Sequence, residues 1–138
     1  MRDYPEIAIE KWCDYISGND DARRWLEENN FRELAEFWDA YENIEQSFQW
    51  LKSNGFLHLA ACIDAANHNS KAKLWLLKYG YTDLAAFCDA SEGNQHAVSI
   101  LLQNEKYQLV RVARTIYSNH KKKKRSFWRI FDFGNPFK

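Results

Sequence analysis

The stretch AKLWLLKYGYTDLAAFCDA, residues 72–90, decides the fold because two close copies of it precede it in the same chain. Residues 47–65 read SFQWLKSNGFLHLAACIDA and residues 22–40 read ARRWLEENNFRELAEFWDA, so the copies start at one constant spacing. A weaker fourth copy begins at Ala97, with Ile100 in the place of tryptophan. Self-similarity at one fixed spacing is typical of proteins built from stacked repeats.

Each copy predicts two short helices. The first carries a small residue, a large residue and a leucine at spacing i, i+3, i+4, as in Ala72, Trp75 and Leu76, which places all three on one helical face. The second carries an aromatic residue, a Leu-Ala pair and two further apolar residues at helical spacing. Asparagines that favour helix starts and glycines that favour positions after helix ends stand where the pattern breaks: Asn19, Asn69, Asn94, Gly55 and Gly80.

The sequence therefore predicts an all-α fold, a right-handed helical-hairpin solenoid of about four and a half 25-residue repeats with about nine short helices. The expected helices span about 5–17, 20–29, 32–42, 44–53, 57–67, 70–79, 82–92, 95–104 and 107–118. Helices of this length are marginal alone, so neighbouring units must bury their apolar faces. We divide the chain into a helical repeat domain, residues 1–119, and a basic and aromatic C-terminal tail, residues 120–138.

Composition narrows the class of protein further. At 46% hydrophobic residues, with five glycines and two prolines, the chain can build a core and lacks the turn residues of an all-β fold. Cys13, Cys62 and Cys88 each lie within an apolar helical pattern, which predicts buried, reduced thiols. We find no signal peptide and no apolar run of membrane-spanning length, and we expect a cytoplasmic protein.

The segment TDLAAFCDASEGNQHAVSILLQNE, residues 82–105, resembles the two-helix part of an ankyrin repeat, and GFLHLAACIDAANHNSKAKLWLLKYG, residues 55–80, is similar. Ankyrin units are about 33 residues long. The residues missing from the present unit correspond to the β-hairpin finger, and the Thr-Pro that opens the ankyrin helix is also absent. The resemblance implies an ankyrin-like helical solenoid without fingers and a binding role for its concave face.

Two sets of repeated residues invite a functional interpretation. The tryptophans Trp25, Trp50 and Trp75 could form an aromatic binding stripe, but their spacing to small residues and leucines favours core positions. The second set, here called the aspartate row, consists of Asp14, Asp39, Asp64 and Asp89. It could form a cation or basic-peptide site, although we favour a structural role in which each side chain accepts hydrogen bonds from backbone N–H groups of the next helix.

Catalytic and metal-binding patterns are poor. His58 and Cys62 stand at i, i+4 and could form half of a metal site, but no second pair with ligand spacing accompanies them. Phosphate-binding glycine loops and hydrolase nucleophile motifs are missing from the sequence. We therefore assign no catalytic residue, no metal and no cofactor, and expect a protein that is not an enzyme.

The C-terminal tail departs from the repeat. Residues 119–138 hold seven basic residues and one acidic residue, a net charge of +6, so the remaining 12 basic and 18 acidic residues give −6. The basic and aromatic tail residues are candidates for contacts with a partner or with the body: Lys121, Lys122, Lys123, Lys124, Arg125, Phe127, Trp128, Arg129, Phe131, Phe133 and Phe137. An acidic body with a basic tail indicates that the tail meets the body itself or an external anion.

Three hypotheses for the tail stay open. It could fold back onto the last helix or a groove of the array, which the opposite charges favour, or it could bind a protein partner or a second copy of the chain. It could also insert at an anionic membrane surface. Sequence-specific binding of nucleic acid is disfavoured because no basic face of the array accompanies the basic run. We expect a protein–protein interaction or scaffold module, with a peripheral membrane protein as the alternative.

Overall fold

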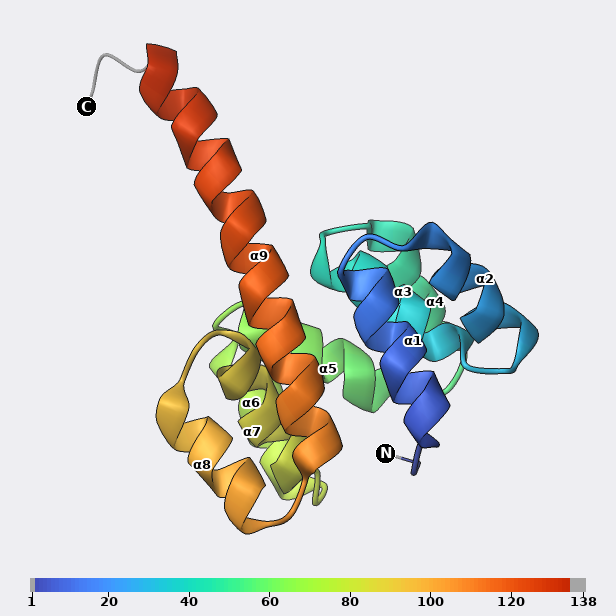
Figure 1. Ribbon diagram of the computed structural model, residues 1–138. Coiled ribbons are helices and arrows are strands. Elements are labelled where there is room, and N and C mark those ends of the chain that lie inside the picture. The colour runs from blue at the N-terminus through green and yellow to red at the C-terminus, as the bar shows by residue number, and fades with distance from the viewer. Residues whose placement is uncertain (1, 135–138) are drawn as a thin grey trace.

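The computed structural model describes the backbone of residues 2–134 and the side chains of residues 2–120 (Figure 1). Over this range the chain forms nine helices and no strand, which confirms the all-α prediction. The helices are α1 (Glu6–Ile16), α2 (Asp20–Glu28), α3 (Arg32–Tyr41), α4 (Glu45–Ser53), α5 (Leu57–Ala66), α6 (Ser70–Lys78), α7 (Thr82–Ser91), α8 (Gln95–Gln103) and α9 (Tyr107–Gly134). From α2 onward, equivalent helices begin at the same constant spacing as the sequence copies.

The turns follow the same spacing. Positive φ angles occur at two sets of positions, each with the period of the sequence repeat: Gly18, Asn43, His68 and Gly93, and Asn30, Gly55, Gly80 and Glu105. The side chains of Asn19, Asn69 and Asn94 each accept hydrogen bonds from backbone N–H groups in the first turn of the following helix, as expected of N-caps. Local sequence therefore marks the starts of α2, α6 and α8 and the positions of the turns between helices.

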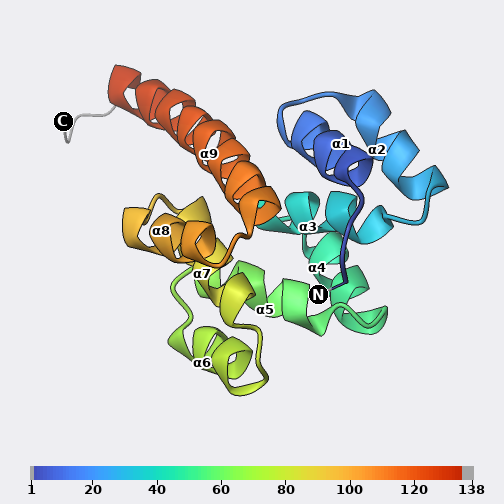
Figure 2. The same cartoon turned by 60° about the horizontal axis from the view of Figure 1, so that its bottom comes forward.

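The odd-numbered helices form an inner layer, and the even-numbered helices pack outside it. Within the described range each even helix contacts only the two odd helices that flank it in the sequence, and Figure 2 shows α2, α6 and α8 at the periphery. Each odd helix packs against the next odd helix, and α1 also packs against α9. Nη1 of Arg111 on α9 lies 3.0 Å from Oε1 of Glu6 on α1. The inner layer is therefore a closed ring of five helices.

Aromatic rings fill the centre of this ring. Trp12 on α1, Phe37 on α3 and Phe87 on α7, here called the aromatic hub, are each at most 1% exposed. Their ring centroids lie 5.5 Å apart for Trp12 and Phe37, 6.2 Å for Trp12 and Phe87, and 6.0 Å for Phe37 and Phe87. The centre of the ring formed by the described helices is thus packed core.

The last helix differs from its prediction. The sequence pattern predicts a helix over 107–118, whereas α9 runs from Tyr107 to Gly134 and crosses the expected boundary between residues 119 and 120 without a break. Its first turns pack on the body through buried Val112, Ala113 and Ile116. Beyond them the helix extends away from the other eight helices (Figure 1). Through Gly134 the backbone does not fold back onto the array, contrary to the hypothesis that the charges favour.

Gly93 marks the point where the turn between α7 and α8 meets α9. A Cβ atom placed on Gly93 would lie 2.7 Å from Cε2 of Tyr117, whereas the same atom on Gly18 would have no neighbour within 4 Å. Both glycines have positive φ angles, so alanine is strained at either position. We expect Gly93→Ala to destabilise the fold by roughly 1–3 kcal/mol more than Gly18→Ala, because the ring of Tyr117 must move. Urea unfolding of the two variants measures the difference, and equal losses would contradict the packing of α9 on this turn.

Candidate functional site

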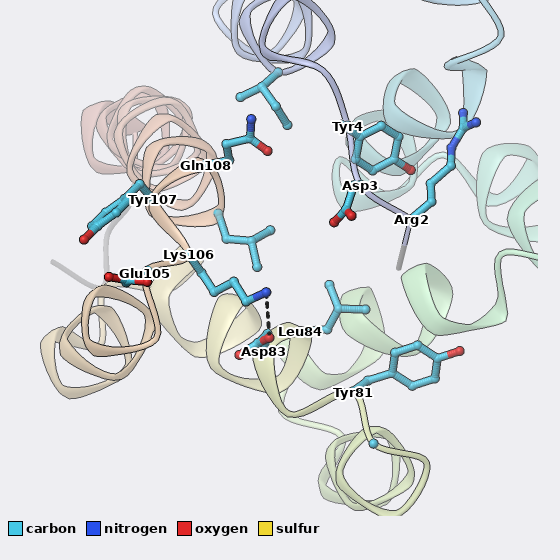
Figure 3. Close-up of a pocket in the computed structure, with 13 residues that line it drawn as sticks. Arg2, Asp3, Tyr4, Tyr81, Asp83, Leu84, Glu105, Lys106, Tyr107 and Gln108 are labelled. Carbon is cyan, nitrogen blue, oxygen red and sulfur yellow. Dashed lines mark ion pairs between the residues drawn. The ribbon is translucent and has the colours of Figure 1, made fainter.

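Closure of the ring creates a polar pocket that sequence reasoning missed. It has a volume of about 340 Å³ and lies where the N-terminal segment meets the starts of α7 and α9 (Figure 3). Nζ of Lys106 lies 3.6 Å from Oδ2 of Asp83 at its edge, and Asp3 and Glu105 add carboxylates. The described residues that line the pocket include no Ser, Thr, Cys or His, so this lining holds no nucleophile–base pair of the hydrolase kind. No sequence signal predicts the pocket, since segment 2–4 reaches segments 80–84 and 105–109 only through closure of the ring.

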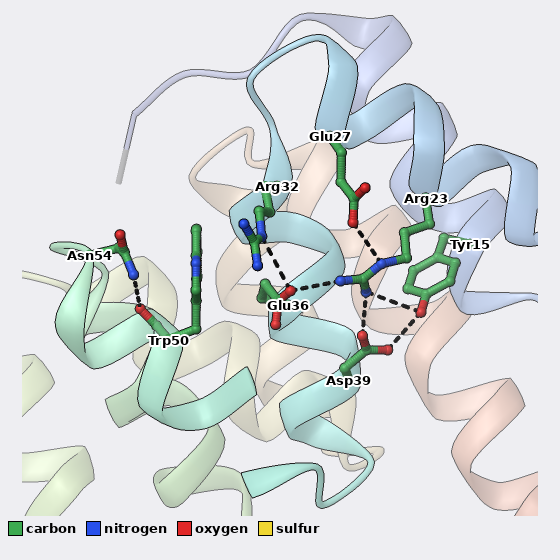
Figure 4. Close-up of polar contacts among 8 residues, drawn as sticks. All are labelled: Tyr15, Arg23, Glu27, Arg32, Glu36, Asp39, Trp50 and Asn54. Carbon is green, nitrogen blue, oxygen red and sulfur yellow. Dashed lines mark hydrogen bonds and ion pairs between the residues drawn. The ribbon is translucent and has the colours of Figure 1, made fainter. Parts of the chain in front are cut away.

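Outside the ring, the aspartate row lies in different environments from one unit to the next. The carboxylate of Asp39 belongs to a polar network centred on Arg23 of α2 (Figure 4). The Arg23 guanidinium donates to Asp39, to Oε1 of Glu36 at 2.6 Å and to Oε1 of Glu27 at 2.9 Å. The Tyr15 hydroxyl donates to Oδ1 of Asp39 at 2.7 Å. One cation thus holds three carboxylates of α2 and α3.

Burial and hydrogen bonding compete within this network. Burial alone would raise the pKa of Glu36, but hydrogen bonds from Ser47 and Arg23 and the Arg23 charge outweigh it and hold that pKa below its usual value. Burial and the hydrogen bond to Asp39 raise the pKa of Tyr15 to about 12. At neutral pH the network therefore holds ionised Glu36 and a protonated Tyr15.

Asp89 repeats part of this arrangement. Nζ of Lys73 on α6 lies 2.5 Å from Oδ2 of Asp89 on α7. Lys73 stands two repeats after Arg23, at the same place in its helix, and Asp89 likewise stands two repeats after Asp39. In both pairs a long basic side chain of an outer helix reaches the aspartate of the following inner helix and neutralises it.

Asp64 lacks this partner. Phe48 stands at the position of Arg23 and Lys73, and Ala61 stands at the position of Glu36. Among the described residues the Asp64 carboxylate has neither a hydrogen bond nor an ion pair. Burial raises the pKa of Asp64, with a smaller opposing effect from the charge of Lys52. The carboxylate is therefore partly buried without the counterion that the neighbouring units supply to theirs.

A groove opens beside Asp64, here called the α4–α6 groove. It has a volume of about 330 Å³. Ala60 and Ala61 of α5 contribute small apolar side chains to its lining, and Phe48 of α4 and Trp75 of α6 contribute aromatic ones. Two lysines, Lys52 and Lys71, also line the groove. It combines an apolar surface with one carboxylate and two cations, a mixture that suits an amphipathic helix or peptide.

The structural role expected of the aspartate row is wrong in its detail. The backbone carbonyls, not the carboxylates, accept from the N–H groups five positions later, each at 3.0 Å, at Asp14, Asp39, Asp64 and Asp89. These bonds close the turns between paired helices and need no particular side chain. The carboxylates of Asp39 and Asp89 pair with cations instead, so the identity of the row is explained by ion pairing at those two positions.

The repeated tryptophans pack against the buried core. Trp25, Trp50 and Trp75 are half-buried at the edge of the core, whereas the leucine after each is fully buried. Each indole stacks on the aromatic residue six positions later, with ring centroids 5.8–6.0 Å apart and planes within 10°: Phe31, Phe56 and Tyr81. Nδ2 of Asn29 and of Asn54 donates to the carbonyl oxygen of the preceding tryptophan. The tryptophans therefore close the outer edge of each unit.

His58 and Cys62, the candidate half of a metal site, lie in different surroundings. His58 stacks on Tyr81 with centroids 5.2 Å apart, while the buried Cys62 thiol lies 3.8 Å from the carbonyl oxygen of Leu84. Within the described part of the chain no group of three or more His, Cys, Asp or Glu side chains could hold a metal ion. All three cysteines are buried and free, as predicted.

None of the helices over residues 2–134 combines the length and the apolar character that crossing a bilayer requires.

The tail candidates are described only in part. Residues 121–134 lie in α9, but their side chains fall outside the described structure, as Phe137 does entirely. This covers the contacts predicted for Lys121, Lys122, Lys123, Lys124, Arg125, Phe127, Trp128, Arg129, Phe131 and Phe133. For residues 121–134 the structure gives the path of the helical backbone alone.

Comparison of the chain with family models, with curated proteins and with solved structures finds no match.

Proposed function

We propose that the protein is a non-enzymatic protein–protein interaction module whose main binding element is the C-terminal half of α9, residues 121–134. The observation that supports this is the length of α9. It has 28 residues, whereas the longest of the other helices, α1, has 11 residues. The C-terminal half of α9 extends beyond the body and carries a basic run followed by large apolar residues. A helix of that composition suits a groove on a partner, where its apolar residues would be buried.

The filled centre of the ring supports the same proposal, because it leaves no inner surface of the described helices on which a partner could bind. An open array would offer its concave surface to a partner. Here the aromatic hub occupies that space, so binding falls to the outer helices and to α9. The body then serves as the folded base that holds the first turns of α9 against α1 and α7.

The finer description of the fold belongs to this proposal as well. We describe the chain as four and a half copies of one two-helix unit, because helix starts and positive φ angles recur with the period of the sequence copies. The ankyrin-like character of the unit stays a prediction. A cytoplasmic location is also proposed, supported by three buried, free thiols, since a reducing compartment keeps such thiols reduced.

A membrane surface is the second candidate for the binding element. The basic run at residues 121–125 would be attracted to anionic head groups, and Phe127, Trp128 and Phe131 are residues that partition into the interface. The support for a membrane function is this composition, a basic run followed by aromatic residues. A protein partner is preferred because the outer face of the body carries a groove suited to a helix, which a membrane function does not require.

One pair of experiments separates the two candidates. Full-length protein and a Phe127→Glu/Phe131→Glu variant are immobilised and used to capture proteins from cells, while both are sedimented with phosphatidylserine vesicles. We expect the wild-type chain to retain a partner protein that the variant loses by about tenfold or more. Equal capture by the two chains would overturn the proposal. Vesicle binding by the wild type alone would transfer the function to the second candidate.

A further inference from the structure

We propose that the α4–α6 groove receives residues 127–134 of a second copy of this chain, with Arg129 pairing with Asp64. This inference rests on the proposed function, since it names the partner of the C-terminal helix. It also gives Asp64, a carboxylate of the aspartate row that has no ion pair among the described residues, a counterion. The occupant is thus a self-association segment, Phe-Trp-Arg-Ile-Phe-Asp-Phe-Gly.

The chain itself contains the pattern for this pairing. At Asp39 the aspartate of the inner helix is met by Arg23, and at Asp89 it is met by Lys73. Both cations come from the outer helix that precedes the aspartate. At Asp64 the equivalent residue is Phe48, which lines the groove and contributes no charge. A guanidinium from another molecule would therefore complete at Asp64 what Arg23 provides at Asp39.

The remaining chemistry of the groove matches the same segment. Its alanine and aromatic lining offers apolar surface to large apolar residues, and the segment has five of them around Arg129. Asp132 follows Arg129 by three positions, a spacing that places both on one side of a helix. Lys52 and Lys71 line the groove and supply cations for Asp132, while Asp64 supplies the anion for Arg129.

The geometry requires a second molecule. Residues 121–134 continue the axis of α9, which leads away from α4 and α6 in both views (Figures 1 and 2). A single rigid helix cannot both extend from the body and return to a groove on the other side of it. The groove of one copy and the C-terminal helix of another carry no such restriction.

Sedimentation equilibrium of the full-length chain tests the inference. We expect concentration-dependent association below roughly 500 µM, weakened about tenfold or more by Asp64→Arg and by Arg129→Asp. The charge-swapped double variant, Asp64→Arg with Arg129→Asp, should recover most of the affinity. Asp14→Arg is the matched control, because Asp14 holds the same place in the first unit, and it should associate as the wild type does. Circular dichroism checks that each variant keeps its helix content.

The outcomes separate this inference from the function on which it rests. A wild-type chain that stays monomeric, or an Asp64→Arg variant that associates as tightly as the wild type, would overturn the inference. A swapped pair that recovers nothing would reject Arg129 as the partner of Asp64. In each case capture of a different protein through Phe127 and Phe131 would still uphold the proposed function, whereas loss of that capture as well would reject both.

Discussion

Replacing Phe37 by alanine should lower the free energy of unfolding by about 3–5 kcal/mol, the largest single-residue effect that the structure predicts. The Phe37 ring is fully buried and contacts Trp12, Tyr41 and Phe87, whose centroids lie 5.5–6.0 Å away. Three helices meet at this side chain, so the cavity left by its removal cannot be closed by the motion of one neighbour. Equilibrium unfolding in urea measures the loss.

Leu74→Ala is the matched control for the core substitution. Leu74 is 64% exposed on α6, so its truncation should change the free energy of unfolding by less than about 0.5 kcal/mol. Phe37→Leu, which keeps most of the volume, should fall between the two. A loss below about 1 kcal/mol for Phe37→Ala would mean that the centre of the ring is not packed as described.

Arg23→Met should lower the free energy of unfolding by about 2–4 kcal/mol. This is less than the loss of a fully buried ion-pair partner would cause, because part of the arginine side chain reaches solvent. The substitution leaves the buried Glu36 carboxylate and the neighbouring Asp39 without their shared cation. Arg24→Met is the control on the same helix, since Arg24 is exposed and should contribute little. The double variant Arg23→Met/Glu36→Gln should regain part of the loss, because it removes a buried charge whose remaining cation, Arg32, lies 3.4 Å away and is half exposed.

The pH dependence of the Arg23 effect has a defined sign. The pKa of Glu36 is lowered in the folded chain, so its pairing stabilises the fold above the unfolded pKa, near 4.5. That contribution disappears as the pH falls through the lower, folded pKa. The difference between wild type and Arg23→Met should therefore be constant near neutral pH and shrink in acid. A difference that grows on acidification would show that Arg23 does not act through Glu36.

Local features of the fold are predictable because they depend on residues close in sequence. Asn19, Asn69 and Asn94 cap the helices that they precede, and Gly55 and Gly80 take the left-handed conformation after α4 and α6. Such signals act over one or two turns and need no knowledge of the packing. Helix boundaries for the first eight helices accordingly agree with prediction to within one or two residues.

Closure of the ring cannot be predicted from residues that are close in sequence. It depends on a rotation between adjacent units that accumulates around the array until α1 meets α9, and no single motif encodes that rotation. The contact between Glu6 and Arg111, 105 residues apart, exists only because of it. The polar pocket is unpredicted for the same reason.

Two expectations about the candidate site are wrong for reasons that the packing explains. Sequence alone treats the aspartate row as one set with one role, but its carboxylates depend on positions 23, 48 and 73 of the outer helices, where the repeat varies. Matching those positions to the aspartates requires the packing of outer on inner helices. The second expectation concerns the lysine run at residues 121–124, which breaks the apolar period and so predicts that the last helix ends before it. The helix continues through the run to Gly134, because lysine and arginine have a high intrinsic preference for helix.

Proton–proton contacts in the aromatic hub test the central claim, a closed ring with a filled centre, most directly. Trp12 and Phe37 lie in neighbouring units, so any stacked array of these helices allows a nuclear Overhauser effect between their rings. Trp12 and Phe87 lie three units apart in the sequence and meet only if the ring closes, with centroids 6.2 Å apart. The closed ring predicts cross-peaks for both pairs in the full-length protein. A spectrum with the Trp12–Phe37 cross-peaks and without those between Trp12 and Phe87 would show an open array and contradict it.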